Sequence, residues 1–130
     1  MSKTKAKTTQ KKVKQVSLAI FNVKVTFNNT IITVTDSCGN CLYQSTPGMQ
    51  GYKNSRKASS FASSKAAEHA LQMLSNYKTK VIEIHFNGPG AQREAICKAI
   101  LGHGEFRVLR IVDKTPIPHN GCRPPKKRRM

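Results

Sequence analysis

Residues 21–27 alternate strictly between apolar and polar side chains, and this pattern constrains the fold more than any other feature of the chain. Alternation with a period of two predicts a β-strand that buries one of its faces. Asn28 and Asn29 follow, and asparagine tolerates the positive backbone torsions of a tight turn. Residues 30–36 alternate again, so we expect the folded part of the chain to begin with a β-hairpin.

The rest of the chain predicts strands and helices in turn. After a turn over 36–40, we expect a strand over 41–45, a loop over 46–57, a helix over about 59–76, a strand over 81–87, a helix over about 93–101 and a strand over 106–112. Strands joined through a helix pair in parallel, because the crossover is too long for a hairpin. The expected fold is therefore α/β, with an antiparallel meander and then β-α-β-α-β in one mixed five-stranded sheet layered with helices.

Positive charge is concentrated at the two ends of the chain. The 130 residues include 23 Lys or Arg and 6 Asp or Glu, which gives a formal net charge of +17. Residues 1–14 hold six lysines and residues 119–130 hold five basic residues, with no acid in either segment. We therefore expect one domain over 15–118, flanked by two basic tails. Neither tail has the apolar residues that offset the entropy of ordering, so both are expected to be disordered until they bind a partner.

A charge this large favours binding to a polyanion, because the unneutralised chain repels itself. Binding to a membrane surface would need a basic helix with an apolar face, and Pro124 and Pro125 exclude a helix from the last segment. An extended basic chain can instead follow a phosphate backbone. No stretch has the apolar length of a membrane span, and no apolar signal segment follows the basic start. We expect a soluble protein that is not secreted and binds nucleic acid.

Two segments of the body carry residues that suit phosphate contacts. The loop over 53–57 combines three basic side chains with an asparagine and a serine, which can fix the protein's position on a phosphate backbone. The turn Gly88-Pro89-Gly90 lies between a predicted strand and a predicted helix N-terminus, where free amides and the helix dipole attract anions. Arg93, in the first turn of that helix, is the expected charged partner. A solvated loop and a plain tight turn are the alternatives.

Four segments of the chain together resemble a known family. They are Phe27-Asn28-Asn29-Thr30-Ile31, Asn54-Ser55-Arg56-Lys57, Gly88-Pro89-Gly90 with Arg93-Glu94, and Pro118-His119-Asn120-Gly121-Cys122-Arg123-Pro124-Pro125-Lys126. In this order and spacing they are similar to the small-subunit ribosomal protein eleven family of bacterial type. The resemblance covers nearly the whole chain from about residue 16, and its last segment is the most specific. Gln92 stands where the family usually has a glycine.

The resemblance implies a ribonuclease-H-like fold and a structural, non-enzymatic role in the small ribosomal subunit. It implies binding of ribosomal RNA on the platform, where the family bridges RNA helices and helps to form the messenger exit (Shine-Dalgarno) cleft. The implied protein partners are small-subunit proteins seven and eighteen, with messenger RNA nearby. We expect no cofactor, no membrane association and no homo-oligomer. The expected location is the ribosome, in bacterial cytoplasm, mitochondrial matrix or plastid stroma.

Charge and the resemblance together predict one set of RNA-binding residues. The set consists of Asn28, Asn29, Lys53, Asn54, Ser55, Arg56, Lys57, Gly88, Pro89, Gly90, Arg93, His119, Asn120, Gly121, Arg123, Lys126, Lys127, Arg128 and Arg129. The asparagine pair enters the set only through the resemblance, because a hairpin tip alone is an ordinary turn. The competing function is a sequence-independent protein that compacts DNA. That function would explain the charge but not the segment over 118–126.

The cysteines raise the alternative of a zinc site. Cys38 and Cys41 have metal-ligand spacing, and His119 and Cys122 would complete four ligands. One pair lies on a predicted hairpin and the other on a predicted tail, so nothing local brings them together. We therefore expect reduced, unpaired cysteines and no metal, with Cys97 in the core.

Catalysis is the remaining class of function. A ribonuclease-H-like enzyme needs clustered carboxylates that hold two metal ions. Residues 15–35 contain no acid, and Asp36 and Glu83 are too few to form such a cluster. His85 is expected on the outward face of its strand, and no spacing indicates a nucleophile beside a base. The sequence therefore predicts a protein that is not an enzyme.

The dipeptide Asn120-Gly121 indicates a chemical modification. Glycine leaves the asparagine side chain unhindered when the following amide nitrogen attacks it, so this pair readily forms a succinimide and then isoaspartate. If the tail is held in one bent conformation on the ribosome, the rearranged backbone would be a stable part of the structure. Asn120 is therefore a candidate for isoaspartate formation.

Overall fold

Five strands, two α-helices and three short 3-10 helices make up the computed structural model, which describes residues 15–130. The predicted basic tail over 1–14 lies outside the described residues. The elements are β1 (Leu18–Val25), β2 (Thr30–Asp36), β3 (Cys41–Ser45), η1 (Pro47–Gln50), η2 (Asn54–Ala58), α1 (Ser60–Leu74), η3 (Ser75–Tyr77), β4 (Val81–Asn87), α2 (Gln92–Gly102) and β5 (Arg107–Asp113). Every predicted strand and helix is present, so the α/β class is confirmed.

The strands form one mixed sheet in the order β3-β2-β1-β4-β5. β1 pairs antiparallel with β2, and β2 pairs antiparallel with β3, which is the predicted meander. β4 pairs parallel with both β1 and β5 across the two helical crossovers. The predicted mixed five-stranded sheet is therefore confirmed, while the closer likeness to ribonuclease H stays a prediction.

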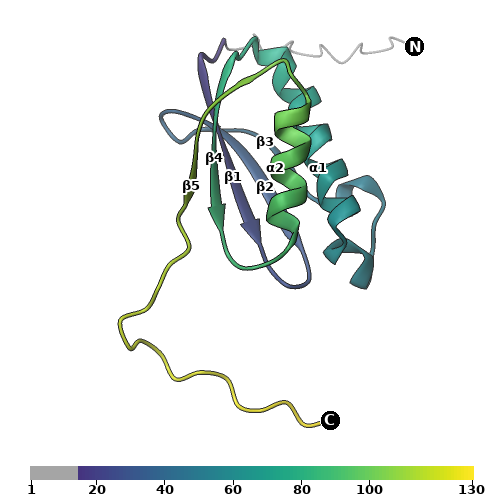
Figure 1. Ribbon diagram of the computed structural model, residues 1–130, viewed down its shortest axis with the longest axis vertical. Coiled ribbons are helices and arrows are strands. Elements are labelled where there is room, and N and C mark those ends of the chain that lie inside the picture. The colour runs from purple at the N-terminus through teal and green to yellow at the C-terminus, as the bar shows by residue number, and fades with distance from the viewer. Residues whose placement is uncertain (1–14) are drawn as a thin grey trace, which may run out of the picture.

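Both helices pack on the same side of the sheet, as Figure 1 shows. The core lies between these layers and includes Phe21, Ile32, Leu71, Ile84 and Ile96, all of them fully buried. Helix α1 faces the core with four buried alanines, at positions 62, 66, 67 and 70. Such small side chains let a helix approach the sheet closely, and this explains how a chain with 38% hydrophobic residues fills a core. Within residues 15–130, no helix is long and apolar enough to cross a membrane.

The predicted boundaries differ most from the observed ones at three places, while the ends of α2 and β5 are each shifted by one residue. β1 begins at Leu18 rather than at residue 21, because residues 18–20 are all apolar and hide the alternation. The predicted loop over 46–57 contains η1, whose Pro47 and Gly48 indicated a loop, and most of η2. Helix α1 begins as predicted, with Ser59 Oγ accepting a hydrogen bond from the amide of Ala62 at 3.1 Å, but it tightens into η3 after Leu74.

The sheet face opposite the helices is only partly open to solvent. His85 lies on this face, as predicted, but the face does not expose it: its side chain is only 6% exposed. The reason is that β4 lies inside the sheet, where side chains from β1 and β5 flank it on both sides. Cys97, predicted to be in the core, is half-buried and packs against the core from α2.

Candidate nucleic-acid interface

One end of the sheet gathers several of the predicted contact segments. β1, β4 and β5 run parallel, so their carboxyl ends meet at the same edge of the sheet (Figure 1). The hairpin tip with Asn28 and Asn29 follows β1, the turn Gly88-Pro89-Gly90 follows β4, and the C-terminal segment follows β5. Segments far apart in the sequence therefore lie together at this edge, which we call the carboxyl edge.

Gln92 joins the basic loop over 53–57 to the carboxyl edge. Its side chain is 6% exposed, and its Nε2 donates hydrogen bonds to the carbonyl oxygens of Ala58 at 3.0 Å and Thr26 at 3.5 Å. One buried amide thus links the end of η2, the hairpin after β1 and the start of α2. From the sequence, Gln92 was notable only because the family usually has a glycine at this position. No local sequence signal could have predicted that its side chain points inward.

The hairpin tip uses one of its two asparagines for its own structure. The side-chain Oδ1 of Asn29 accepts a hydrogen bond from the backbone amide of Thr30 at 2.8 Å. The backbone amide of Asn29 donates to Thr26 Oγ1 at 3.0 Å. Asn28 is exposed, and within residues 15–130 its side chain makes no hydrogen bond to protein. Phe27 beside it is 76% exposed. Strand alternation would bury Phe27 on the face of Val25, but β1 ends at Val25, so the ring is free to contact a partner.

The basic loop presents most of its side chains to solvent. Lys53, Asn54, Ser55 and Arg56 are exposed and Lys57 is half-buried. Asn54 begins η2 with a φ of 56°, a left-handed conformation that asparagine adopts more readily than most residues. Within the described part of the chain, no ion pair neutralises Lys53, Arg56 or Lys57. The loop is therefore a compact, unneutralised cationic turn.

The turn after β4 lies against the neighbouring strand. Gly88 has a φ of 103°, and a Cβ at this position would collide with the carbonyl oxygen of Val25. Only glycine allows this approach. Helix α2 starts at Gln92 with no side-chain cap, so its first amides have no partner from a capping side chain. The anion contact that we predict at this helix N-terminus after a glycine turn stays a prediction.

Arg93 is partly committed to an intramolecular ion pair. Its guanidinium lies 3.1 Å from Asp113 Oδ2 and 5.0 Å from the centre of the Phe86 ring, and its side chain stays 31% exposed. Hydrogen bonds from the Thr115 hydroxyl, then from the Thr115 amide and Arg93, lower the pKa of Asp113 to about 2. The Thr115 hydroxyl also accepts a hydrogen bond from the Gly88 amide at 3.1 Å. This network fixes the direction in which the chain leaves β5.

The C-terminal segment extends away from the sheet, as Figure 1 shows. Residues 119–130 contain no helix or strand, and every one of them is exposed. The segment bends at Asn120, whose φ is 59°, and the next residue, Gly121, lies close to Pro118: an added Cβ there would be 3.1 Å from the Pro118 side chain. The predicted contact residues of the segment are therefore accessible; they are His119, Asn120, Gly121, Arg123, Lys126, Lys127, Arg128 and Arg129.

The two acids considered for catalysis lie on opposite faces of the sheet. Asp36 is opposite Ala19 on the helix side, whereas Glu83 is opposite Ile20 on the other side. Asp36 accepts hydrogen bonds from the amides of Cys38 and Asn40, both at 2.9 Å, and thus holds the turn after β2. The two carboxylates cannot share a metal ion.

The structure also brings no zinc site together. Cys38, Cys41 and Cys122 are exposed free cysteines. Among residues 15–130, no group of three or more His, Cys, Asp or Glu side chains is arranged to hold a metal ion. The described part of the chain is thus a basic α/β scaffold whose polar contact groups gather at one edge of the sheet.

Comparison with known proteins identifies the family. Residues 19–129 match the family model described as "Ribosomal protein S11". Two relatives named "Small ribosomal subunit protein uS11", from Psychromonas ingrahamii and Idiomarina loihiensis, are each 46% identical over 130 residues and cover all of both chains. A relative of the same name from Chromobacterium violaceum is 50% identical over 122 residues, covering 93% of this chain and 92% of its own.

The chain belongs to the ribosomal protein S11 family. It is a structural constituent of the small ribosomal subunit and takes part in translation at the ribosome. The family is structural rather than catalytic, in agreement with the separation of the two acids. The resemblance found in the sequence is therefore confirmed.

Proposed function

We propose that this protein binds small-subunit ribosomal RNA through its carboxyl edge and its basic C-terminal segment. The observation that carries the proposal is the convergence of the hairpin tip, the basic loop, the glycine turn and the start of the C-terminal segment at one edge of the sheet. Lysine and arginine contacts to phosphates supply affinity, and the asparagine and serine side chains fix position. The body over 15–118 acts as a rigid platform, and residues 119–130 act as an arm.

This arrangement suits a protein that bridges RNA helices. A body that contacts one helix at the carboxyl edge can extend its arm toward another, because the arm leaves β5 without folding back (Figure 1). We place the protein on the platform of the subunit, beside the messenger exit cleft and small-subunit proteins seven and eighteen, as the family resemblance implies. The bacterial relatives support the bacterial cytoplasm, with mitochondrial matrix or plastid stroma as the organellar alternatives.

The test compares two triple variants with the same loss of charge. In the first, alanine replaces Lys53, Arg56 and Lys57 in the basic loop. In the control, alanine replaces Lys78, Lys80 and Arg107, which lie at the opposite end of the sheet beside the amino ends of β4 and β5. Co-sedimentation with small subunits in a high-magnesium gradient, and affinity for a platform RNA fragment, are measured for both.

We predict that the loop variant binds RNA about tenfold or more weakly, because it loses its phosphate contacts. The affinity of the control variant should stay close to that of the unaltered protein. Equal losses in both variants would contradict a contact surface at the carboxyl edge. Equal affinity for duplex DNA and for platform RNA would instead favour the sequence-independent DNA-binding function.

A further inference from the structure

A hollow lies on the sheet face opposite the helices, close to the carboxyl edge. It has a volume of about 210 Å³, and its lining includes Asn22, Lys24, Thr33, His85, Asn87 and Lys114. Lys24 and Asn87 are register partners on β1 and β4, and Lys114 directly follows β5. We call this hollow the open-face pocket. Because Lys114 directly follows β5 at the carboxyl edge, the pocket is continuous with the proposed RNA-binding surface.

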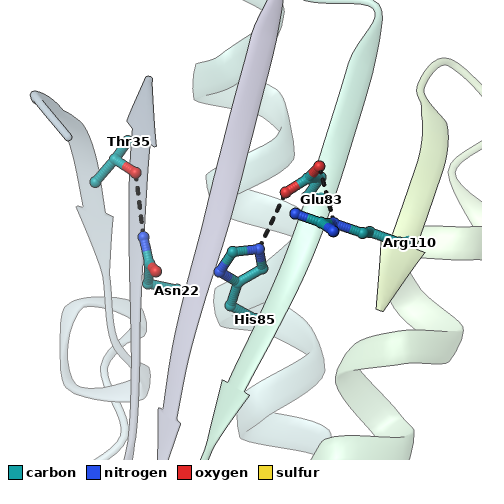
Figure 2. A network of polar contacts seen from close by, with 5 residues as sticks. All are labelled: Asn22, Thr35, Glu83, His85 and Arg110. Atoms are coloured by element: carbon teal, nitrogen blue, oxygen red, sulfur yellow. Dashed lines mark hydrogen bonds and ion pairs between the residues drawn. The ribbon is translucent and has the colours of Figure 1, made fainter. Parts of the chain in front are cut away.

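His85 presents an unsatisfied polar atom in this pocket. Its Nε2 lies 3.1 Å from Glu83 Oε2, and the other oxygen of Glu83 accepts a hydrogen bond from Arg110 Nε at 3.1 Å (Figure 2). The hydrogen bond from His85, followed by the charge of Arg110, lowers the pKa of Glu83 despite its burial, so this group is a carboxylate at neutral pH. A carboxylate only accepts hydrogen bonds, so the proton of the neutral His85 ring lies on Nε2.

The second ring nitrogen of His85 is left without a partner. His85 Nδ1 is buried and makes no hydrogen bond within residues 15–130. Figure 2 shows this nitrogen on the side of the ring that faces Asn22, the register partner of His85 on β1. Asn22 itself donates to Thr35 Oγ1 at 3.1 Å. In the neutral ring Nδ1 is an acceptor, so a hydrogen-bond donor that enters the pocket would satisfy it once the side chains that cover this atom move aside.

The charges of the pocket select an anion. Lys24 and Lys114 line it, none of its lining residues is acidic, and neither lysine forms an ion pair within the described residues. The amides of Asn22 and Asn87 add donors and acceptors. A fitting ligand therefore carries a negative charge close to a hydroxyl or amino donor. Each nucleotide of RNA has both, in its phosphate and its ribose 2′-hydroxyl.

We propose that the open-face pocket binds one unpaired nucleotide of RNA, with Lys24 and Lys114 at the phosphate and His85 Nδ1 accepting a hydrogen bond from the ribose 2′-hydroxyl. This inference rests on the proposed RNA-binding function and adds a site that distinguishes RNA from DNA. An acidic peptide also meets the charge requirement, and its backbone N–H groups could donate to His85 Nδ1. The continuity of the pocket with the proposed RNA-binding surface favours RNA, and the peptide is tested as the competing ligand. The hollow, with a volume of about 210 Å³, can take the sugar and phosphate of one nucleotide but not a duplex.

The experiment uses the full chain with ¹⁵N-labelled histidine and follows the His85 ring nitrogens by NMR. The probes are a short single-stranded RNA, the DNA of the same sequence and an acidic peptide. We expect RNA to shift the His85 Nδ1 signal, and DNA to shift it less. The double variant Lys24→Gln and Lys114→Gln, which changes surface residues of the pocket, should weaken RNA binding about tenfold. The control variant Lys78→Gln and Lys80→Gln, at the opposite end of the sheet, should not weaken it beyond about twofold.

A second variant tests the hydrogen bond itself. His85→Gln should reduce the preference for RNA over DNA by about fivefold to tenfold, the usual effect of one lost hydrogen bond. A thermal melt shows whether this variant folds. If it does not fold, the Lys24→Gln and Lys114→Gln variant still tests the pocket through its RNA affinity. RNA that binds and shifts signals of the C-terminal segment but leaves His85 unchanged would overturn the pocket and preserve the proposed function. Failure of RNA to bind at all would overturn the proposed function, and a His85 shift with the peptide alone would identify a protein partner instead.

Discussion

Gly88 shows how a single residue sets the shape of the carboxyl edge. Its φ of 103° and its approach to the carbonyl of Val25 leave no room for a side chain. Gly39 is a matched comparison, since its φ is 93° but a Cβ there would meet no atom within 4 Å. The two positions separate the strain of a left-handed backbone from the cost of a steric clash.

We predict that Gly88→Ala lowers the free energy of unfolding by about 3 kcal/mol or more, because it adds a clash to backbone strain. Gly39→Ala should lower it by about 1 kcal/mol, from strain alone. Urea denaturation of both variants measures the difference. Equal losses would show that the chain relaxes away from Val25 and that the close approach is not required.

Asp113 gives the structure a defined response to acid. Its folded pKa of about 2 lies below the ordinary value of 3.8, so its stabilising contribution is present above the unfolded pKa and is lost as the pH falls through about 2. Thr115→Val removes the hydroxyl donor, so the pKa of Asp113 should rise toward 3.8. It should remain below that value, because the amide of residue 115 and Arg93 still donate.

Carbon NMR of the Asp113 carboxyl group measures this pKa directly. Thr115→Ser keeps the hydroxyl and should keep the pKa near that of the unaltered protein. A pKa that does not move in Thr115→Val would mean that the hydroxyl bond is absent in solution.

Asn120 lies in a bend of the exposed C-terminal segment and is followed by Gly121, the pair for which we predict isoaspartate formation. We expect the Gly121 amide nitrogen to attack the Asn120 side-chain carbonyl and release ammonia, and water then opens the succinimide to isoaspartate. Gly121→Ala should slow the reaction, because the added methyl hinders the attacking amide. Peptide mass spectrometry of assembled subunits checks this prediction, and unmodified asparagine in those subunits would reject it.

At the scale of the element, the sequence predicted whether a segment is a helix or a strand better than it predicted where that segment begins and ends. Alternation located β2 and β4, and the Ser59 signal located the start of α1, because each depends on neighbours within a few residues. The burial of His85 could not be predicted, since it depends on β4 lying inside the sheet. The role of Gln92 was equally hidden, because its acceptors lie 34 and 66 residues away in the chain.

The cap of α1 provides a test at this scale. Ser59→Ala removes the hydrogen bond to the Ala62 amide and should lower the free energy of unfolding by about 1 kcal/mol. Ser59→Asp should retain most of the stability, since aspartate also caps. Ser60→Ala, one residue further along, serves as the control and should have little effect. Thermal denaturation that ranks Ser60→Ala below Ser59→Ala in stability would contradict the assigned cap.

At the scale of the whole molecule, layered helices leave one sheet edge and one sheet face for partners. The helices occupy a single side of the sheet, and the three parallel strands direct their following segments to the carboxyl edge (Figure 1). Composition predicted a polyanion partner, and the resemblance predicted which segments would meet it. The gathering of those segments at one edge follows from strand order and direction, which no single segment encodes.

The central claim is that the carboxyl edge and the C-terminal segment contact phosphates together. The most direct measurement is the salt dependence of RNA binding between about 50 and about 300 mM, for the full chain and for a chain without residues 119–130. If about eight phosphates are neutralised, the plot of log K against log salt should have a slope of roughly −6 to −7, and the deletion should make it shallower by up to about 4. A slope that the deletion leaves unchanged would contradict the account.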